Sequence, residues 1–199
     1  MTRPPRPRLP GRPRGVTLIE MLFTLVLFGI IAGGLVMSFT MSHRAFTTAD
    51  ASVYVQQQAR HAFTEMTQEL HTAGGVVAAA GNQLAVQLDL GYNLAAPCPA
   101  NAVCWGARDQ AGAVQSGWSI RYRQNGTQLL REILNTAGVV QVGTRVLAND
   151  VTQATFTYTG ATRTVAVQLQ VRRASPNLPG GSIAAAPNAL MTTIRLRNP

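Results

Sequence analysis

The sequence predicts an α+β protein in which a long N-terminal helix packs on an antiparallel β-sheet. Three observations support this fold class. Residues 21–41 carry no charge, apolar residues recur mostly every three, four or seven positions over 43–73, and short segments from residue 84 onward alternate apolar with polar side chains. With 199 residues, the chain is long enough for one ordinary domain besides the apolar segment.

The first fourteen residues are rich in proline and arginine and offer no apolar face, so they are unsuited to a stable helix. They hold five of the seventeen basic residues and no acid, so much of the formal net charge of +9 lies here. The uncharged residues 21–41, at about 1.5 Å each, match the roughly 30 Å hydrocarbon core of a membrane. The positive-inside rule places the N-terminus in the cytoplasm and the rest of the chain outside.

The sequence GVTLIE occupies residues 15–20, just before the apolar segment. It resembles the prepilin cleavage and methylation motif of type IV pilins and pseudopilins, although that family most often has phenylalanine at the position of Val16. The resemblance implies a pilin-like fold, cleavage after Gly15 by a membrane aspartic peptidase, and methylation of the new amine of Val16. It also implies that Glu20 pairs with the N-terminal amine of a neighbouring subunit during filament assembly.

Glu20 begins an otherwise apolar helix, where a charged carboxylate costs about 2.5–3.5 kcal/mol at the bilayer centre and less near the interface. The alternative interpretation is an interfacial glutamate that reaches the lipid headgroups. Under the pilin resemblance the chain divides into four parts: a leader at 1–15, a transmembrane half-helix at 16–41, an amphipathic half-helix at 42–75 and a β-rich periplasmic or extracellular head at 76–199.

The amphipathic half-helix is expected to end at Gly74-Gly75. Residues 56–74 are similar to PilW-type minor pilins and J-type minor pseudopilins. The head is expected to form one antiparallel sheet, with a tight turn at Asn125-Gly126 and a loop at 177–187. Its strands are expected near 84–90, 118–123, 128–134, 154–158, 165–171 and 190–197.

Cys98 and Cys104 close a short loop and, in an exported head, favour a disulfide worth about 2–3 kcal/mol. The alternative is a pair of free thiols in a reducing compartment. Trp105 follows directly, and it is either an exposed contact for another subunit or a cover for the core.

Catalytic chemistry has no support in the sequence, which contains no phosphate loop, nucleophile elbow or paired carboxylates. His61, Glu65 and Glu69 recur at every fourth position and could share a helix face as metal ligands. Such a trio is more often a solvated face. We therefore expect no enzyme, no metal and no cofactor.

Several arginines of the head are candidate contacts for DNA phosphates, although solubilising arginines are commoner. They are Arg121, Arg123, Arg172 and Arg173. Three functions remain open: a minor pilin that initiates assembly or lies at the tip of a type IV pilus, with a role in DNA uptake or twitching; a minor pseudopilin of a type II secretion system; and a DNA-binding receptor. The expected partners are a prepilin peptidase, other pilins or minor pilins through the N-terminal helix, and the bacterial inner membrane, with DNA as an unproven candidate.

Overall fold

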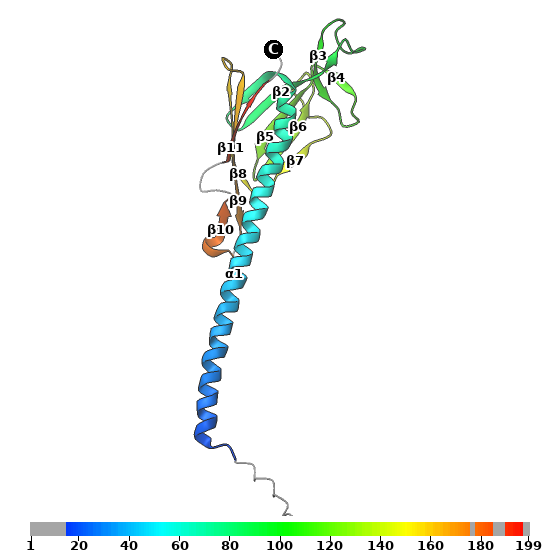
Figure 1. The fold of residues 1–199 in the computed structure, drawn as a ribbon. Coiled ribbons are helices and arrows are strands. Elements are labelled where there is room, and N and C mark those ends of the chain that lie inside the picture. The colour runs from blue at the N-terminus through cyan, green and yellow to red at the C-terminus, as the bar shows by residue number, and fades with distance from the viewer. Residues whose placement is uncertain (1–14, 176–177, 185–189, 197–199) are drawn as a thin grey trace, which may run out of the picture. The chain divides into compact units, whose positions relative to one another are not determined.

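The computed structural model describes residues 15–175, 178–184 and 190–196 (Figure 1). The chain divides into two compact units, and the boundary between them falls between His43 and Arg44. Helix α1 (Leu18–His71) contributes residues to both units.

In the first unit, the helix exposes its apolar side chains on all sides. Leu25, Phe28 and Phe39 are 71%, 72% and 73% exposed. The hydroxyl of Thr24 donates to the carbonyl oxygens of Glu20 and Met21, at 3.0 and 2.9 Å, so this polar group is satisfied by the helix itself. The segment has a mean hydropathy of 2.3 and is long and apolar enough to cross a membrane.

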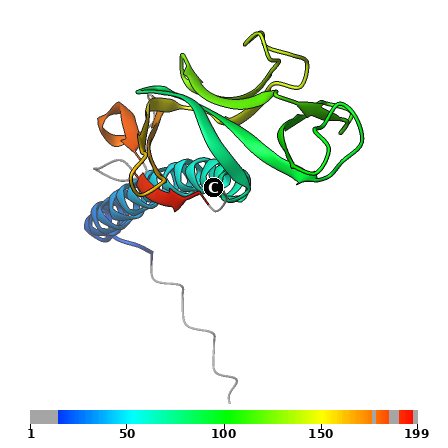
Figure 2. The same ribbon diagram turned by 90° about the horizontal axis from the view of Figure 1, so that it is seen from above.

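In the second unit, the helix buries a stripe of residues spaced by three or four positions, as expected for one face of an α-helix. The stripe alternates small and larger side chains and comprises Ala51, Val55, Ala59, Ala62, Met66 and Leu70. Figure 2 shows most of the strands over one side of this part of the helix. The alanines let the strands approach, and the larger side chains fill the space between them.

The larger sheet has seven strands within the described residues, all of whose pairs are antiparallel. They are β1 (Ala73–Ala80), β2 (Gln83–Tyr92), β3 (Val103–Arg108), β4 (Val114–Ser116), β5 (Ser119–Asn125), β6 (Gln128–Leu134) and β7 (Arg145–Ala148). Strand β2 is central and pairs with β1, β3 and β5. The backbone of β7 meets the helix, where the ring of His61 lies 3.2 Å from the Leu147 carbonyl oxygen.

The second sheet has four strands among the described residues: β8 (Val151–Thr159), β9 (Thr164–Ala174), β10 (Ser182–Ala184) and β11 (Leu190–Arg195). Strand β9 pairs with the other three. A short 3₁₀ turn, η1 (Pro179–Gly181), precedes β10. The two sheets are joined at Gln124, whose side-chain oxygen accepts from the Ala154 amide at 2.8 Å, and at Gly81, whose carbonyl accepts from the Phe156 amide at 2.7 Å.

One hydrophobic core lies between the helix and both sheets. Met66 and Leu70 of the helix share it with Tyr122 and Ile120 of β5 and with Phe156 of β8. Each large apolar side chain buried in this way contributes about 1.5–3 kcal/mol relative to exposure. The helix therefore holds the two sheets together.

The predicted fold class is confirmed, because a long N-terminal helix packs on antiparallel strands. The predicted tight turn also forms: β5 and β6 flank Asn125-Gly126, where Gly126 has a φ of 59°. The strands expected near 154–158 and 165–171 form as β8 and β9, which pair with each other. The expectation of one sheet is wrong, because the strands separate into two. Of the expected loop at 177–187, residues 182–184 form β10, and the part at 177 and 185–187 lies outside the described residues.

The predicted helix end at Gly74-Gly75 is wrong as well. The helix ends at His71, and both glycines lie in strand β1. The physical reason for Gly74 is a close approach: a Cβ atom there would overlap the ring of Trp105 on β3. The glycine pair therefore reflects packing between strands and not the end of the helix.

Candidate functional site

The first candidate site is the start of helix α1. Gly15 and Val16 precede the helix and are exposed, Val16 by 65%. No described atom lies within 4 Å of where a Cβ would stand on Gly15. The fold of this chain therefore does not require a glycine at position 15, and the peptide bond after it is open to another molecule.

Glu20 occupies the third position of the helix, and Thr17 precedes the helix as its N-cap. The amide of Glu20 lies 3.1 Å from the Thr17 carbonyl oxygen and 3.4 Å from its hydroxyl. A threonine followed three residues later by glutamate is the spacing of a capping box. The positive end of the helix dipole also favours a carboxylate here. Glu20 is exposed, so its carboxylate is available either to its own helix or to a neighbour.

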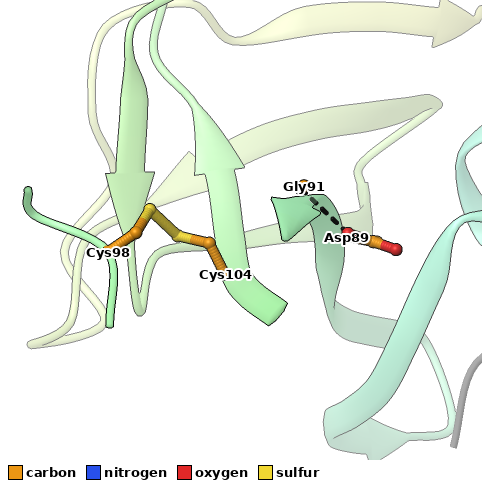
Figure 3. The surroundings of a disulfide bond; sticks show 4 residues. All are labelled: Asp89, Gly91, Cys98 and Cys104. Atoms are coloured by element: carbon orange, nitrogen blue, oxygen red, sulfur yellow. Dashed lines mark hydrogen bonds between the residues drawn. A yellow bond between two sulfur atoms is a disulfide. The ribbon is translucent and has the colours of Figure 1, made fainter. Parts of the chain in front are cut away.

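The head contains the Cys98–Cys104 disulfide shown in Figure 3. Backbone hydrogen bonds close the same loop, since the Asn93 amide donates to the Ala102 carbonyl at 3.0 Å. Nearby, the Asp89 carboxylate accepts from the Gly91 amide at 2.9 Å. The disulfide therefore staples a loop that leads into β3.

Trp105, directly after this loop, is half-buried and lies against Gly74 of β1. Its indole thus covers the region where β1 and β3 lie on either side of β2. Packing against Gly74 within the head therefore explains the position of the Trp105 ring.

Arg121 and Arg123 project from β5 toward Glu132 of β6 and form two ion pairs with it. Arg121 Nη2 lies 2.6 Å from Glu132 Oε2, and Arg123 Nη2 lies 2.7 Å from Oε1. Burial would raise the pKa of Glu132, but the hydrogen bonds from Arg123 and Arg121 outweigh it, and the pKa is lowered. These two arginines are thus engaged by an internal carboxylate that is only 3% exposed.

Arg172 and Arg173 lie on β9, in the other sheet from Arg121 and Arg123. Arg172 Nε donates to the Ser182 hydroxyl at 2.7 Å. The Arg173 guanidinium lies 4.5 Å from the centre of the Tyr54 ring, a cation–π contact, and 4.0 Å from Asp50. The structure therefore distributes the four candidate arginines over two sheets, each with contacts inside the head.

A buried polar cluster ties the helix to the larger sheet. Glu69 of α1 accepts hydrogen bonds from the Tyr122 hydroxyl and from Arg131 Nε, the latter at 2.9 and 3.0 Å. Burial, reinforced by the nearby Glu69 carboxylate, raises the pKa of Tyr122 well above its ordinary value. His61, Glu65 and Glu69 contact different partners, and no cluster of metal-ligating residues occurs in the part of the chain that the structure describes.

One charged feature was missed by sequence reasoning. Arg108, Arg131 and Arg145 come from three different strands and line one hollow of about 330 Å³. They are separated in sequence by 14 to 37 positions, and no local pattern joins them. Only the pairing of β6 with β7 and the placement of β3 bring them together.

The N-terminal site matches a known family. Residues 11–36 fit the family model described as the prokaryotic N-terminal methylation motif. The chain therefore carries, at these residues, the signal of type IV pilin precursors, and this signal supports a pilin-like protein. The motif and the apolar helix together fit a pilin anchored in the inner membrane.

Within that class, the matched motif does not distinguish a pilin from a pseudopilin. Searches among curated proteins and among solved structures found no match for the chain.

Proposed function

We propose that this chain is the precursor of a minor pilin, a structural subunit that helps to initiate a type IV pilus or lies at its tip. The observation that carries the proposal is the methylation motif at the start of a helix whose apolar side chains are exposed on all sides. An exposed apolar helix requires a bilayer or a bundle of similar helices to cover it. In a precursor held in the membrane, the bilayer covers the helix, and after the subunit joins a filament, the neighbouring helices cover it.

In this proposal the arginine-rich residues 1–15 are a cytoplasmic leader, and a prepilin peptidase cuts after Gly15 and methylates Val16. The head then lies on the periplasmic side. That compartment is oxidising, which is consistent with the Cys98–Cys104 disulfide. The exported chain can be alkylated before and after reduction and its mass measured. Neither cysteine should be alkylated until the disulfide is reduced.

Glu20 has a specific role in this scheme. Among the residues before Asp50 it is the single acid, and its exposed carboxylate can pair with the amine of Val16 on a neighbouring subunit. Such a pair would neutralise both charges among apolar helices and would set the axial position of one subunit against the next. Before assembly, the same carboxylate can cap its own helix.

Processing is tested by co-expression with a prepilin peptidase and mass spectrometry of the intact product. The expected product has lost residues 1–15 and gained one methyl group. An intact leader would overturn the assignment of the N-terminal site. Arg60→Gln, an exposed change in the amphipathic half of helix α1, serves as a control that should be processed normally.

Assembly is tested with two variants of Glu20. A capping box accepts glutamine as well as glutamate, whereas an ion pair needs the charge. Glu20→Gln and Glu20→Ala should therefore both reduce incorporation into filaments at least tenfold, with leader cleavage retained. Thr24→Ala is the matched control in the same helix, because the Thr24 hydroxyl donates to the carbonyl oxygens of Glu20 and Met21 within its own helix. Normal assembly of Glu20→Gln would refute the pairing role and favour the capping role.

A minor pseudopilin of a type II secretion system is the close rival, since the same motif and helix serve both systems. Deletion of the gene separates the two: loss of pili supports the pilin, whereas retention of secreted enzymes in the periplasm supports the pseudopilin. DNA contact by Arg121, Arg123, Arg172 and Arg173 stays a prediction from the sequence. Gel-shift binding by the chain that weakens with added salt would support it.

A further inference from the structure

The hollow lined by Arg108, Arg131 and Arg145 lies between the end of β3 and strands β6 and β7. Its volume of about 330 Å³ suits one inserted side chain better than an extended strand of nucleic acid. One acid, Asp109, also lines it. Whether a partner could bind there depends on which of these charges are already engaged.

Asp109 forms its hydrogen bonds within its own loop. Its carboxylate accepts from the amides of Ala111 and Ala113 at 3.0 and 2.8 Å, and from the Gln115 side-chain amide at 3.0 Å. The hydrogen bonds from Gln115 and Ala113 lower the pKa of Asp109, so its carboxylate stays ionised while it holds this turn. Its oxygens are directed to those donors and not to the arginines of the hollow.

The three arginines differ in how far they are engaged. Arg131 is bound by Glu69 and is a fixed part of the fold. Arg145, whose side chain is 58% exposed, lies 3.7 Å from Glu65, longer than a hydrogen bond. Arg108 is exposed and donates one hydrogen bond, to the Gly112 carbonyl at 3.0 Å. Arg108 and Arg145 therefore present guanidinium groups with unused donor capacity, and such groups bind carboxylates in a bidentate manner.

An exposed apolar side chain adjoins the hollow in the chain. Val142, next to Gly143 of the lining, is 76% exposed. An exposed valine gains nothing from a phosphate backbone, and among the described residues no aromatic ring lines the hollow on which a base could stack. Apolar contacts beside a charged pocket are typical of protein interfaces.

We propose that this hollow is a docking site for a segment of another protein that inserts an aspartate or glutamate side chain between Arg108 and Arg145 and covers Val142 with an apolar residue. A second copy of this chain is disfavoured because its residues from Arg44 onward hold twelve arginines against seven acids. Like charges facing each other across an interface are costly. The partner is thus a different chain with an acidic segment. The inference concerns the head and does not depend on the proposed filament role.

The test uses the full chain in its host, with a photo-crosslinking amino acid in place of Val142. We expect a cross-link to a different protein, at a segment containing aspartate or glutamate. The double variant Arg108→Gln/Arg145→Gln should lower the yield at least fivefold. Arg60→Gln, another exposed arginine, is the matched control and should leave the yield unchanged. Arg145→Glu combined with an arginine in place of the partner's acid exchanges the two charges, and this combination should restore the cross-link.

Several outcomes would overturn the proposal. These are no cross-link, a cross-link to a second copy of this chain, a cross-link to a segment without acids, or a yield that the double variant leaves unchanged. A cross-link to nucleic acid would also overturn it, because the partner would then be a phosphate backbone and not a protein segment. Circular dichroism of the purified double variant in detergent establishes that it is folded, and its leader cleavage reports separately on the proposed processing.

Discussion

The Glu69 cluster allows a direct test of how the helix is held to the larger sheet. The change is Glu69→Gln, which keeps the shape of the side chain and removes its charge. In the native chain, Glu69 accepts from Arg131 at 2.8 to 3.0 Å and from the fully buried Tyr122 hydroxyl. The variant leaves the Arg131 guanidinium, only 12% exposed, opposite a neutral amide.

Removing one partner of a fully buried ion pair costs about 3–5 kcal/mol because the other charge remains buried. Glu69 is 21% exposed, so water can reach part of the cluster and make the loss of stability smaller. We therefore expect the free energy of unfolding to fall by about 2–3 kcal/mol. With a urea dependence of about 2 kcal/mol per molar, the unfolding midpoint should drop by about 1–1.5 M.

The assay is urea unfolding of the full chain in a mild detergent, followed by tryptophan fluorescence. Both tryptophans, Trp105 and Trp118, lie in the head, so the signal reports on the head and not on the apolar helix. Glu65→Gln is the control one turn earlier, because its 3.7 Å pair with Arg145 is partly exposed and worth at most about 1 kcal/mol. Equal losses in the two variants would refute the reasoning.

Two further predictions concern packing and pH. Gly74→Ala should destabilise the head by about 1–3 kcal/mol, because the added Cβ would overlap the Trp105 ring, whereas Gly75→Ala meets nothing within 4 Å and should change stability little; equal effects in the same unfolding assay would contradict this. Because the pKa of Glu132 is lowered in the folded state, its ionised carboxylate stabilises the fold at pH values above the unfolded-state pKa of about 4.3. This contribution is lost as the pH falls through the folded-state pKa. Glu132→Gln should therefore be less stable at pH 7 yet lose less stability between pH 5 and pH 3, and parallel curves for the two proteins would contradict the assignment.

The parts of the fold that follow from the sequence are those set by local patterns. The uncharged run at 21–41 and the three- and four-residue spacing after it predicted one long helix. The first is a run long and apolar enough to cross a membrane, and the second reflects burial of one helix face. Alternation predicted β5, where Ile120 and Tyr122 meet the core between arginines, and the turn signal at Asn125-Gly126 predicted that β6 follows it. The motif at 15–20 located the N-terminal site because its residues are contiguous.

The parts that could not be predicted depend on contacts between distant segments. Gly74 could not be assigned to a strand without knowing that Trp105 would lie on it. Nothing in the local sequence indicates which arginines Glu132 contacts, because strand pairing places it opposite Arg121. The way in which the two sheets are joined likewise depends on tertiary contacts, such as those of Gln124 with β8, which no periodicity predicts.

These contacts change how the basic charge of the protein is interpreted. Five arginines belong to the first fourteen residues, which the proposed processing removes, and Arg121, Arg123 and Arg131 are matched by buried or half-buried carboxylates. A high net charge is therefore a poor guide to a polyanionic partner for this chain. What distinguishes Arg108 and Arg145 is unused donor capacity near the exposed Val142, and the proposed partner with an acidic segment rests on that local property more than on the total charge.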